Sequence, residues 1–387
     1  MKTVYLDETP AGYSMGTSQG GGVVQVQYRG ISLSSNGKDF IRKVEGFPNK
    51  ILQLVSEDFH ASDIRCFVAI IHADLKVEVY INELEIYGEA LAAKSVKAGE
   101  PVRKSDVYHF HRISFKDLEF PPDSAYIVIL NNGWDRILCY DFGPINEKEN
   151  YRPIDYDVGR FIGAGLSASI FYDIFDLDES EWDKVISSGW FPFSYLGYEQ
   201  QKTLFAYIKA GWNTDEIEKT IDELFCKGSE VWLEQIATNE KIAQHYGIIE
   251  SAMKYHINKQ YDASIHILYP RIEALLREDF IRANPSKEGR RQEALSEHIP
   301  TSITQHTHSI TRLFPEQFGE YIREYYFKDF NVSCMSDFVS RNTLGHGVAT
   351  AASFTRKSSL IGFLILDQIH RYTDLSSKLE IRGIGEI

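Results

Sequence analysis

The spacing of hydrophobic and polar residues changes partway along the chain, from strand-like to helical. In the first part, Lys76–Ile81 alternates with a period of two, as a half-buried strand does, and Cys66–Ile71 is a short, continuous apolar run. Ala125–Leu130 and Arg136–Tyr140 flank the pair Asn132-Gly133, whose residues accept the positive φ angles of a hairpin turn. These patterns predict a β-rich domain, folded as a sandwich or an open barrel.

Helical spacing begins after Asn146–Pro153, a polar segment that ends in proline and is the expected domain boundary. Asn213–Glu216 is typical of a capping box that opens a helix. The stretch from Tyr261 to about Arg282 predicts a long helix, in which Pro270 is expected to cause a kink. The polar stretch Asn284–Pro300 is expected to be a loop or an insertion. Further helices are expected near Asp178–Trp182, Gln200–Ala210, Ile242–Ile257, Pro315–Phe327 and Ser358–Tyr372.

The chain is therefore expected to belong to the α+β class and to divide into three parts. Residues 1–145 are predicted to form the β-rich domain. Residues 146–238 are expected to be a helical connecting region, and residues 239–387 an all-α helical bundle.

Length and composition place the chain among ordinary globular proteins. It has 387 residues, of which 43% are hydrophobic and 25% charged, as expected for two or three domains. No apolar run approaches the ~20 residues of a membrane span, and the N-terminus lacks the pattern of a signal peptide. The cysteines are isolated and are expected to be free thiols, which predicts a cytoplasmic protein. They are Cys66, Cys139, Cys226 and Cys334.

The formal net charge of −14 limits how the chain could bind nucleic acid. A protein that holds nucleic acid by its overall field is basic, whereas this one repels it at long range. Any RNA site must therefore be a local positive patch, for example one made by dimerisation.

The segment Ser340–Gly347 carries the clearest candidate chemistry. Arg341 is a permanent, forked phosphate binder, and His346 is of the one residue type that ordinarily exchanges protons near neutral pH. Asn342 adds a polar amide directly after the arginine. Gly345 and Gly347 lack Cβ and would let the backbone approach a phosphate closely.

This segment resembles the Arg-Asn-x-x-x-His signature of the HEPN superfamily, helical domains that include many metal-independent ribonucleases. Upstream, Tyr261–Arg277 resembles the second helix of abortive-infection-type members, which carry a Pro-x-x-Glu-x-x-Leu element that here includes Pro270 and Glu273. Both elements occur in the family's order, with an insertion between them. The resemblance covers about the last 150 residues.

The resemblance implies a HEPN-type bundle and an endoribonuclease that needs no metal or other cofactor. In such enzymes the ribose 2′-hydroxyl attacks the adjacent phosphate, which leaves a cyclic phosphate and a 5′-hydroxyl. His346 would be the general acid or base, and Arg341 would bind the scissile phosphate. Asn342 would orient one of them or bind the substrate.

Glu273 and Arg277 lie four residues apart on the predicted helix, which leaves two interpretations open. They form a surface ion pair, or one or both help to line the substrate cleft. In the second case Glu273, Arg277, Gly345 and Gly347 would contact the substrate.

A single histidine serves poorly when a reaction needs both a base and an acid. The resemblance implies a homodimer that brings two motifs into one cleft. It also implies a toxin or antiphage-defence role, with the β-rich part as a sensing or targeting domain. A regulatory ligand, an antitoxin or a phage trigger remains unidentified. The alternative is a non-catalytic protein that dimerises and binds RNA or nucleotides, with the β-rich domain as the recognising part.

Two other patterns have weaker implications. His109 and His111, and likewise His306 and His308, have the spacing of two metal ligands on a strand, but neither pair has an obvious third ligand, so no metal is expected. The aromatic run Trp190–Tyr195 suits either base stacking or a buried core, and the core is favoured.

Overall fold

The computed structural model divides the chain into two compact units, Met1–Phe175 and Asp176–Ile387. The helices α3 (Val158–Ile170) and α4 (Tyr172–Phe175) belong to the first unit. The structure describes residues 1–8, 13–14, 18–24, 26–55, 64–132, 135–142, 154–175, 177–285, 291–304, 307–331 and 333–381.

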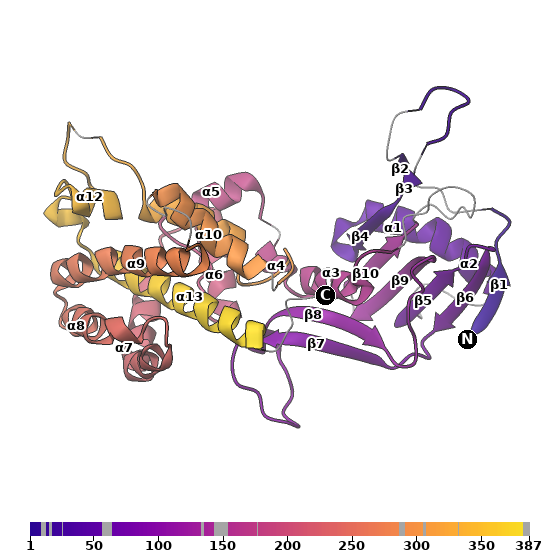
Figure 1. Ribbon diagram of the computed structural model, residues 1–387, viewed down its shortest axis with the longest axis horizontal. Helices are drawn as coiled ribbons and strands as arrows, with labels where there is room; N and C mark the ends of the chain where they lie inside the picture. The colour runs from indigo at the N-terminus through magenta and orange to yellow at the C-terminus, as the bar shows by residue number, and fades with distance from the viewer. Residues whose placement is uncertain are drawn as a thin grey trace. The chain divides into compact units, whose positions relative to one another are not determined.

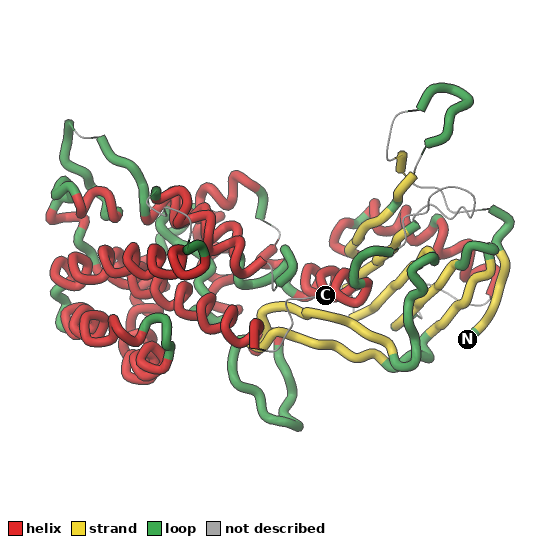
Figure 2. Tube along the Cα trace, in the orientation of Figure 1, coloured by secondary structure: helices red, strands yellow, loops and turns green. Residues whose placement is uncertain are grey.

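The first unit is built on a six-stranded antiparallel sheet with the strand order β1-β6-β5-β9-β10-β4 (Figures 1 and 2). The two central strands, β5 and β9, are buried on both faces, which explains why their sequences are continuously apolar. Two further two-stranded sheets, the hairpins β2–β3 and β7–β8, accompany it. The strands are β1 (Lys2–Tyr5), β2 (Tyr13–Ser14), β3 (Val26–Gln27), β4 (Arg29–Leu33), β5 (Cys66–Ile71), β6 (Lys76–Ile81), β7 (Ile86–Ala92), β8 (Val107–Phe115), β9 (Ala125–Asn132) and β10 (Asp135–Asp141).

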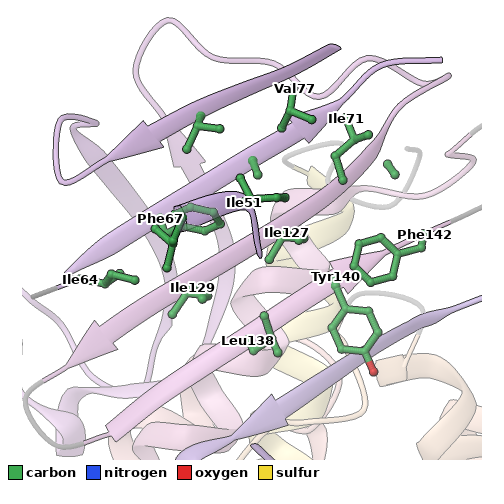
Figure 3. Packing of buried hydrophobic residues seen from close by; sticks show 14 of the residues in the cluster. Ile51, Ile64, Phe67, Ile71, Val77, Ile127, Ile129, Leu138, Tyr140 and Phe142 are labelled. Atoms are coloured by element: carbon green, nitrogen blue, oxygen red, sulfur yellow. The ribbon is translucent and has the colours of Figure 1, made fainter. Parts of the chain in front are cut away.

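One face of the sheet is covered by α1 (Lys38–Glu45) and α2 (Phe47–Val55). Phe67 and Ile127 from the central strands pack there in one cluster with Ile51 of α2 (Figure 3). Alternate residues of the same strands point to the opposite face, where a second apolar cluster forms.

The opposite face is covered by the β7–β8 hairpin and by α3, which packs mainly on β8. Two glycines allow this close approach. A Cβ at Gly163 would lie 2.7 Å from the carbonyl oxygen of Phe110, and one at Gly159 would lie 2.7 Å from that of Ile113. The hydroxyl of Ser167 fixes the contact, because it accepts a hydrogen bond from the Phe110 N–H at 2.8 Å.

The first unit confirms the predicted strands at 66–71, 76–81, 125–130 and 136–140, but it is neither a sandwich nor an open barrel. Helices cover one face of the sheet, and a hairpin and α3 cover the other, so the described residues of this unit form no second large sheet. The unit also extends to Phe175, beyond the expected limit at residue 145, because α3 packs on its strands. The tip of the predicted Asn132-Gly133 turn lies outside the described residues.

The second unit is helical, and α9 (Tyr261–Ala283) packs against α8, α10, α12 and α13. Figure 1 shows α9 and α13 side by side. The segment expected to connect the domains, residues 146–238, is divided between the units: its later part supplies α5 to α7 of this second unit, whereas α3 and α4 belong to the first. The other helices are α5 (Glu179–Ser187), α6 (Tyr198–Ala210), α7 (Asp215–Thr238), α8 (Tyr246–Ile257), α10 (Gln292–Thr304), α11 (Pro315–Tyr321), α12 (Arg341–Gly345) and α13 (Arg356–Ile381), and a π-helical turn spans Ile322–Tyr326.

The long helices predicted in this half are confirmed, and α9 runs through Pro270 as one helix. The expected loop at 284–300 is wrong, because α10 begins at Gln292 and buries Leu295 and Ile303. At the start of α7 no capping box forms. Instead, the Asn213 carboxamide oxygen accepts from the Asp215 N–H at 2.6 Å.

The aromatic run Trp190–Tyr195 confirms the preferred core interpretation, since Trp190, Phe191 and Phe193 are fully buried. Within the described part of the chain, no helix combines the length and apolar character needed to cross a membrane.

Replacing Gly163 with alanine is expected to destabilise the protein by about 1–3 kcal/mol, because the new methyl group would push α3 away from the β8 backbone. Urea unfolding of the full chain, followed by circular dichroism, measures this change. Gly247 in α8 is the matched control, because a Cβ there meets no atom within 4 Å. Gly247→Ala should instead stabilise by about 0.5–1 kcal/mol. Equal stability of Gly163→Ala and wild type would contradict the close packing of α3.

Candidate functional site

The motif segment forms a short, locally fixed helix, α12. Ser340 caps its start: the Ser340 hydroxyl oxygen accepts from the Thr343 N–H at 3.1 Å, and the Thr343 hydroxyl oxygen accepts from the Ser340 N–H at 2.8 Å. A parallel bridge between Ser336 and Ala349 closes the loop that contains the helix. The local conformation of the motif is therefore set by polar contacts within its own segment.

Glu273 holds the motif arginine against α9. The Glu273 carboxylate forms an ion pair with Arg341 Nε through one oxygen and accepts from Arg277 Nη2 at 2.6 Å through the other. Glu273 is only 9% exposed, so its charge depends on these two cations. Two guanidinium groups face one carboxylate, so the cluster of Glu273, Arg277 and Arg341 carries a net positive charge.

Gly345 makes room for the guanidinium. A Cβ at this position would overlap Arg341 Nη1, so a side chain here would displace the flexible end of the arginine, and no positive φ angle is involved. Gly347 differs, because it has φ +66°, which glycine adopts without strain. Nη1 of Arg341 therefore lies beside the exposed Gly345 at the end of α12.

Asn342 points into the protein. Its Nδ2 donates to the carbonyl oxygen of Phe327 at 2.7 Å, and its Oδ1 accepts from Gln292 Nε2 at 2.7 Å. The residue is buried and ties α12 to α10 and to the end of the π-helical turn. These contacts give it a positioning role and replace the expectation that it binds substrate directly.

His346 follows α12 and is exposed. Its backbone N–H donates to the Asn342 carbonyl oxygen at 3.1 Å, and its ring lies 5.1 Å from the ring of Phe330. The structure thus brings Arg341 and Arg277 into contact with Glu273 and leaves the His346 imidazole exposed, five residues after Arg341.

Tyr326 lies beneath this cluster. Its hydroxyl donates to the Tyr269 carbonyl oxygen on α9. Burial and the negative charge of Glu273 raise the pKa of Tyr326 well above its ordinary value, so the hydroxyl remains a neutral donor.

Sequence reasoning missed a pocket in the first unit, between α1, α2 and the sheet. It has a volume of about 170 Å³ and combines aromatic walls with the cations Arg42 and Lys43. Burial, together with a hydrogen bond that its hydroxyl donates to Tyr28, raises the pKa of Tyr140 in this pocket to about 12. The residues lining it come from four separate segments, so no local sequence signal marks it. They are Tyr28, Arg42, Lys43, Gly46, Phe47, Pro48, Ile127, Leu138, Tyr140 and Phe142.

The structure brings a group of possible metal ligands together, but this group does not include the paired histidines noted in the sequence. His109 and His111 lie on β8 with their ring centres 6.1 Å apart, and His306 lies outside the described residues. Among the described residues, the side chains of Asp222, Cys226 and His256 form such a group. The spacing of Asp222 and Cys226, four residues apart on one helix, is the only sequence signal for it.

Comparisons with models of known protein families, with curated proteins and with solved structures found no match.

Removing the side-chain amide of Asn342 is expected to destabilise the second unit. Asn342→Ala should lower the free energy of unfolding by about 1–3 kcal/mol, because it leaves the Phe327 carbonyl and Gln292 without their partner. Asn258, exposed at the end of α8, provides the control, and Asn258→Ala should change stability by less than about 0.5 kcal/mol. Denaturant unfolding measures both. An Asn342→Ala variant as stable as wild type would contradict the positioning role.

Proposed function

We propose that the helical unit is a metal-independent endoribonuclease of the HEPN type. The observation that supports this most directly is the state of Arg341. Glu273 forms an ion pair with its guanidinium at Nε, Nη1 lies beside the exposed Gly345, and the accessible His346 follows at the end of the same short helix. A cationic fork and an exposed imidazole on one short segment suit phosphodiester chemistry.

In the proposed reaction, the ribose 2′-oxygen attacks the adjacent phosphorus and the bond from phosphorus to the 5′-oxygen breaks. One imidazole accepts the 2′-hydroxyl proton, and a second supplies a proton to the leaving oxygen. The products are a 2′,3′-cyclic phosphate and a 5′-hydroxyl.

Arg341 would donate hydrogen bonds to the non-bridging phosphate oxygens as their negative charge grows. Such a donor contributes most when it is already oriented before the reaction. Glu273 supplies that orientation, and Arg277 offsets part of the carboxylate charge, so that the cluster stays positive. Asn342 acts through the placement of α12.

The need for both an acid and a base supports a homodimer in which two motifs share one cleft. Each copy would then contribute one His346 and one Arg341. Two copies also double the positive charge at the cleft, which offsets the repulsion expected from a chain of net charge −14. A toxin or antiphage-defence role follows from the family resemblance.

RNA cleavage in the presence of EDTA tests the proposal. Wild type should produce cyclic-phosphate ends, and both Arg341→Ala and His346→Ala should lower the rate by about 10²–10⁴-fold. His266→Ala is the matched control, because His266 is exposed on α9 outside the motif, and it should cleave at the wild-type rate.

Circular dichroism in the same buffer shows whether each protein remains folded in EDTA. Full cleavage by both motif variants would sink the proposal. Folded wild type that cleaves no RNA would favour the alternative, a non-catalytic binding protein whose β-rich unit does the recognising. The aromatic and cationic pocket of that unit is the observation that favours this second function.

The shared cleft predicts how mixed dimers behave. If one cleft needs two histidines, a co-expressed equal mixture of wild-type and His346→Ala subunits should retain about a quarter of the activity, because only wild-type homodimers cleave. Differently tagged subunits allow the mixed dimers to be isolated and assayed. Retention of about half of the activity would show that each subunit works alone.

A further inference from the structure

Four polar side chains form a continuous hydrogen-bonded chain inside the second unit, away from the motif. His256 on α8 lies at its centre: Nε2 is 2.9 Å from Asp222 Oδ1 of α7, and Nδ1 is 2.8 Å from Ser359 Oγ of α13. Ser359 in turn contacts Ser264 of α9 at 3.0 Å. His256, Ser359 and Ser264 are almost completely buried.

The direction of these hydrogen bonds fixes a proton on His256. Ser264 donates its only hydroxyl proton to the carbonyl oxygen of Ala252 at 2.9 Å, so it must accept from Ser359. Ser359 has then used its own proton and can only accept from His256. Nδ1 of His256 therefore carries a hydrogen and donates to Ser359.

This assignment leaves Nε2 with a lone pair when the imidazole is neutral. Nε2 faces a carboxylate oxygen at 2.9 Å, and two facing lone pairs repel each other unless a cation lies between them. The cation is either a proton, which gives an imidazolium–carboxylate pair, or a metal ion.

A third donor atom distinguishes this place from an ordinary ion pair. The sulfur of Cys226 lies one helical turn after Asp222 on α7, and the three ligand atoms of Asp222, Cys226 and His256 all lie within 4.8 Å of one another. Thiolate, imidazole and carboxylate are each ligands that Zn²⁺ takes in proteins.

We propose that Asp222, Cys226 and His256 bind a zinc ion, with a water molecule as the fourth ligand. In a tetrahedral site with bonds of about 2.0–2.3 Å, two ligand atoms lie about 3.3–3.8 Å apart. The imidazole and carboxylate must then separate by a few tenths of an ångström, and the thiol releases its proton to solvent. Asp222 and Cys226 are partly exposed, so the ion has a path from solvent.

The surroundings suit such a site. Ser359 is the oxygen acceptor that a metal-bound histidine commonly uses for its second nitrogen. Tyr261 and Phe363 pack against the His256 ring at 5.6 and 5.3 Å and hold its orientation. Arg356 approaches the other Asp222 oxygen, Oδ2, at 4.0 Å, which leaves Oδ1 for the ion.

The ion would join α7 to α8, and the serine contacts would extend that connection to α9 and α13. This inference departs from the expectation that the chain binds no metal, but it shares no residue with the proposed ribonuclease site. The site is tested without RNA.

Cobalt binding to the full-length, metal-stripped protein tests the site. Co²⁺ bound by a thiolate gives a near-ultraviolet charge-transfer band, and tetrahedral Co²⁺ gives strong visible bands. Wild type should show both at one equivalent of Co²⁺, and Zn²⁺ should displace them. Cys226→Ser should lose the charge-transfer band, and Ser359→Ala should bind Zn²⁺ about 10–100-fold more weakly.

Cys334→Ser is the matched control, because Cys334 is an exposed free thiol on a loop of the same unit. This variant should keep the full spectrum. Absence of the bands in folded wild type, or their loss in Cys334→Ser, would overturn the proposal. So would ¹⁵N NMR of His256 showing a protonated Nε2 in the presence of excess Zn²⁺.

Discussion

The arrangement around α9 depends on the buried carboxylate of Glu273. Because α9 packs against four other helices, a charge on its inner side is removed from water and persists only with compensating cations. Arg277 supplies one from the same helix. Arg341 supplies the other from a distant segment, so electrostatic attraction, more than apolar burial, determines where the five-residue helix α12 lies.

Directional hydrogen bonds then convert this placement into a defined geometry. A helix as short as α12 buries too little apolar surface to be held by packing, and Ser340 and Asn342 anchor it instead. The same principle operates around His256, where two serine hydroxyls determine which imidazole nitrogen bears a hydrogen. In this unit, apolar packing sets the positions of the long helices. Hydrogen bonds set the orientation of Asn342 and determine which nitrogen of His256 bears a hydrogen.

Sequence periodicity predicted the elements that bury a continuous or regularly spaced apolar face, such as β5, β6, α9 and α13. It failed for α10, whose buried residues Leu295 and Ile303 are two turns apart among charged residues. It also missed α1 and α2, and with them the layer that turns the expected sandwich into a sheet covered by helices.

The candidate site was predictable only as separate parts. The sequence identified Arg341 and Glu273 on different segments, but their contact depends on tertiary folding. The pair formed by Glu273 and Arg277 exists as an ion pair, although the carboxylate is buried rather than on the surface. The inward direction of Asn342 and the grouping of Asp222 with His256 could not be read from spacing, because each depends on partners from other helices.

The bridge between Ser336 and Ala349 has a consequence for how this segment can vary in evolution. It makes the motif loop a closed module, whose ends stay together whatever precedes or follows them. Insertions and deletions outside the bridge leave the separation of Arg341 and His346 unchanged, whereas a single residue added between them rotates one relative to the other by about a quarter of a helical turn. Length changes are therefore expected to preserve the motif when they fall in the flanks of the module.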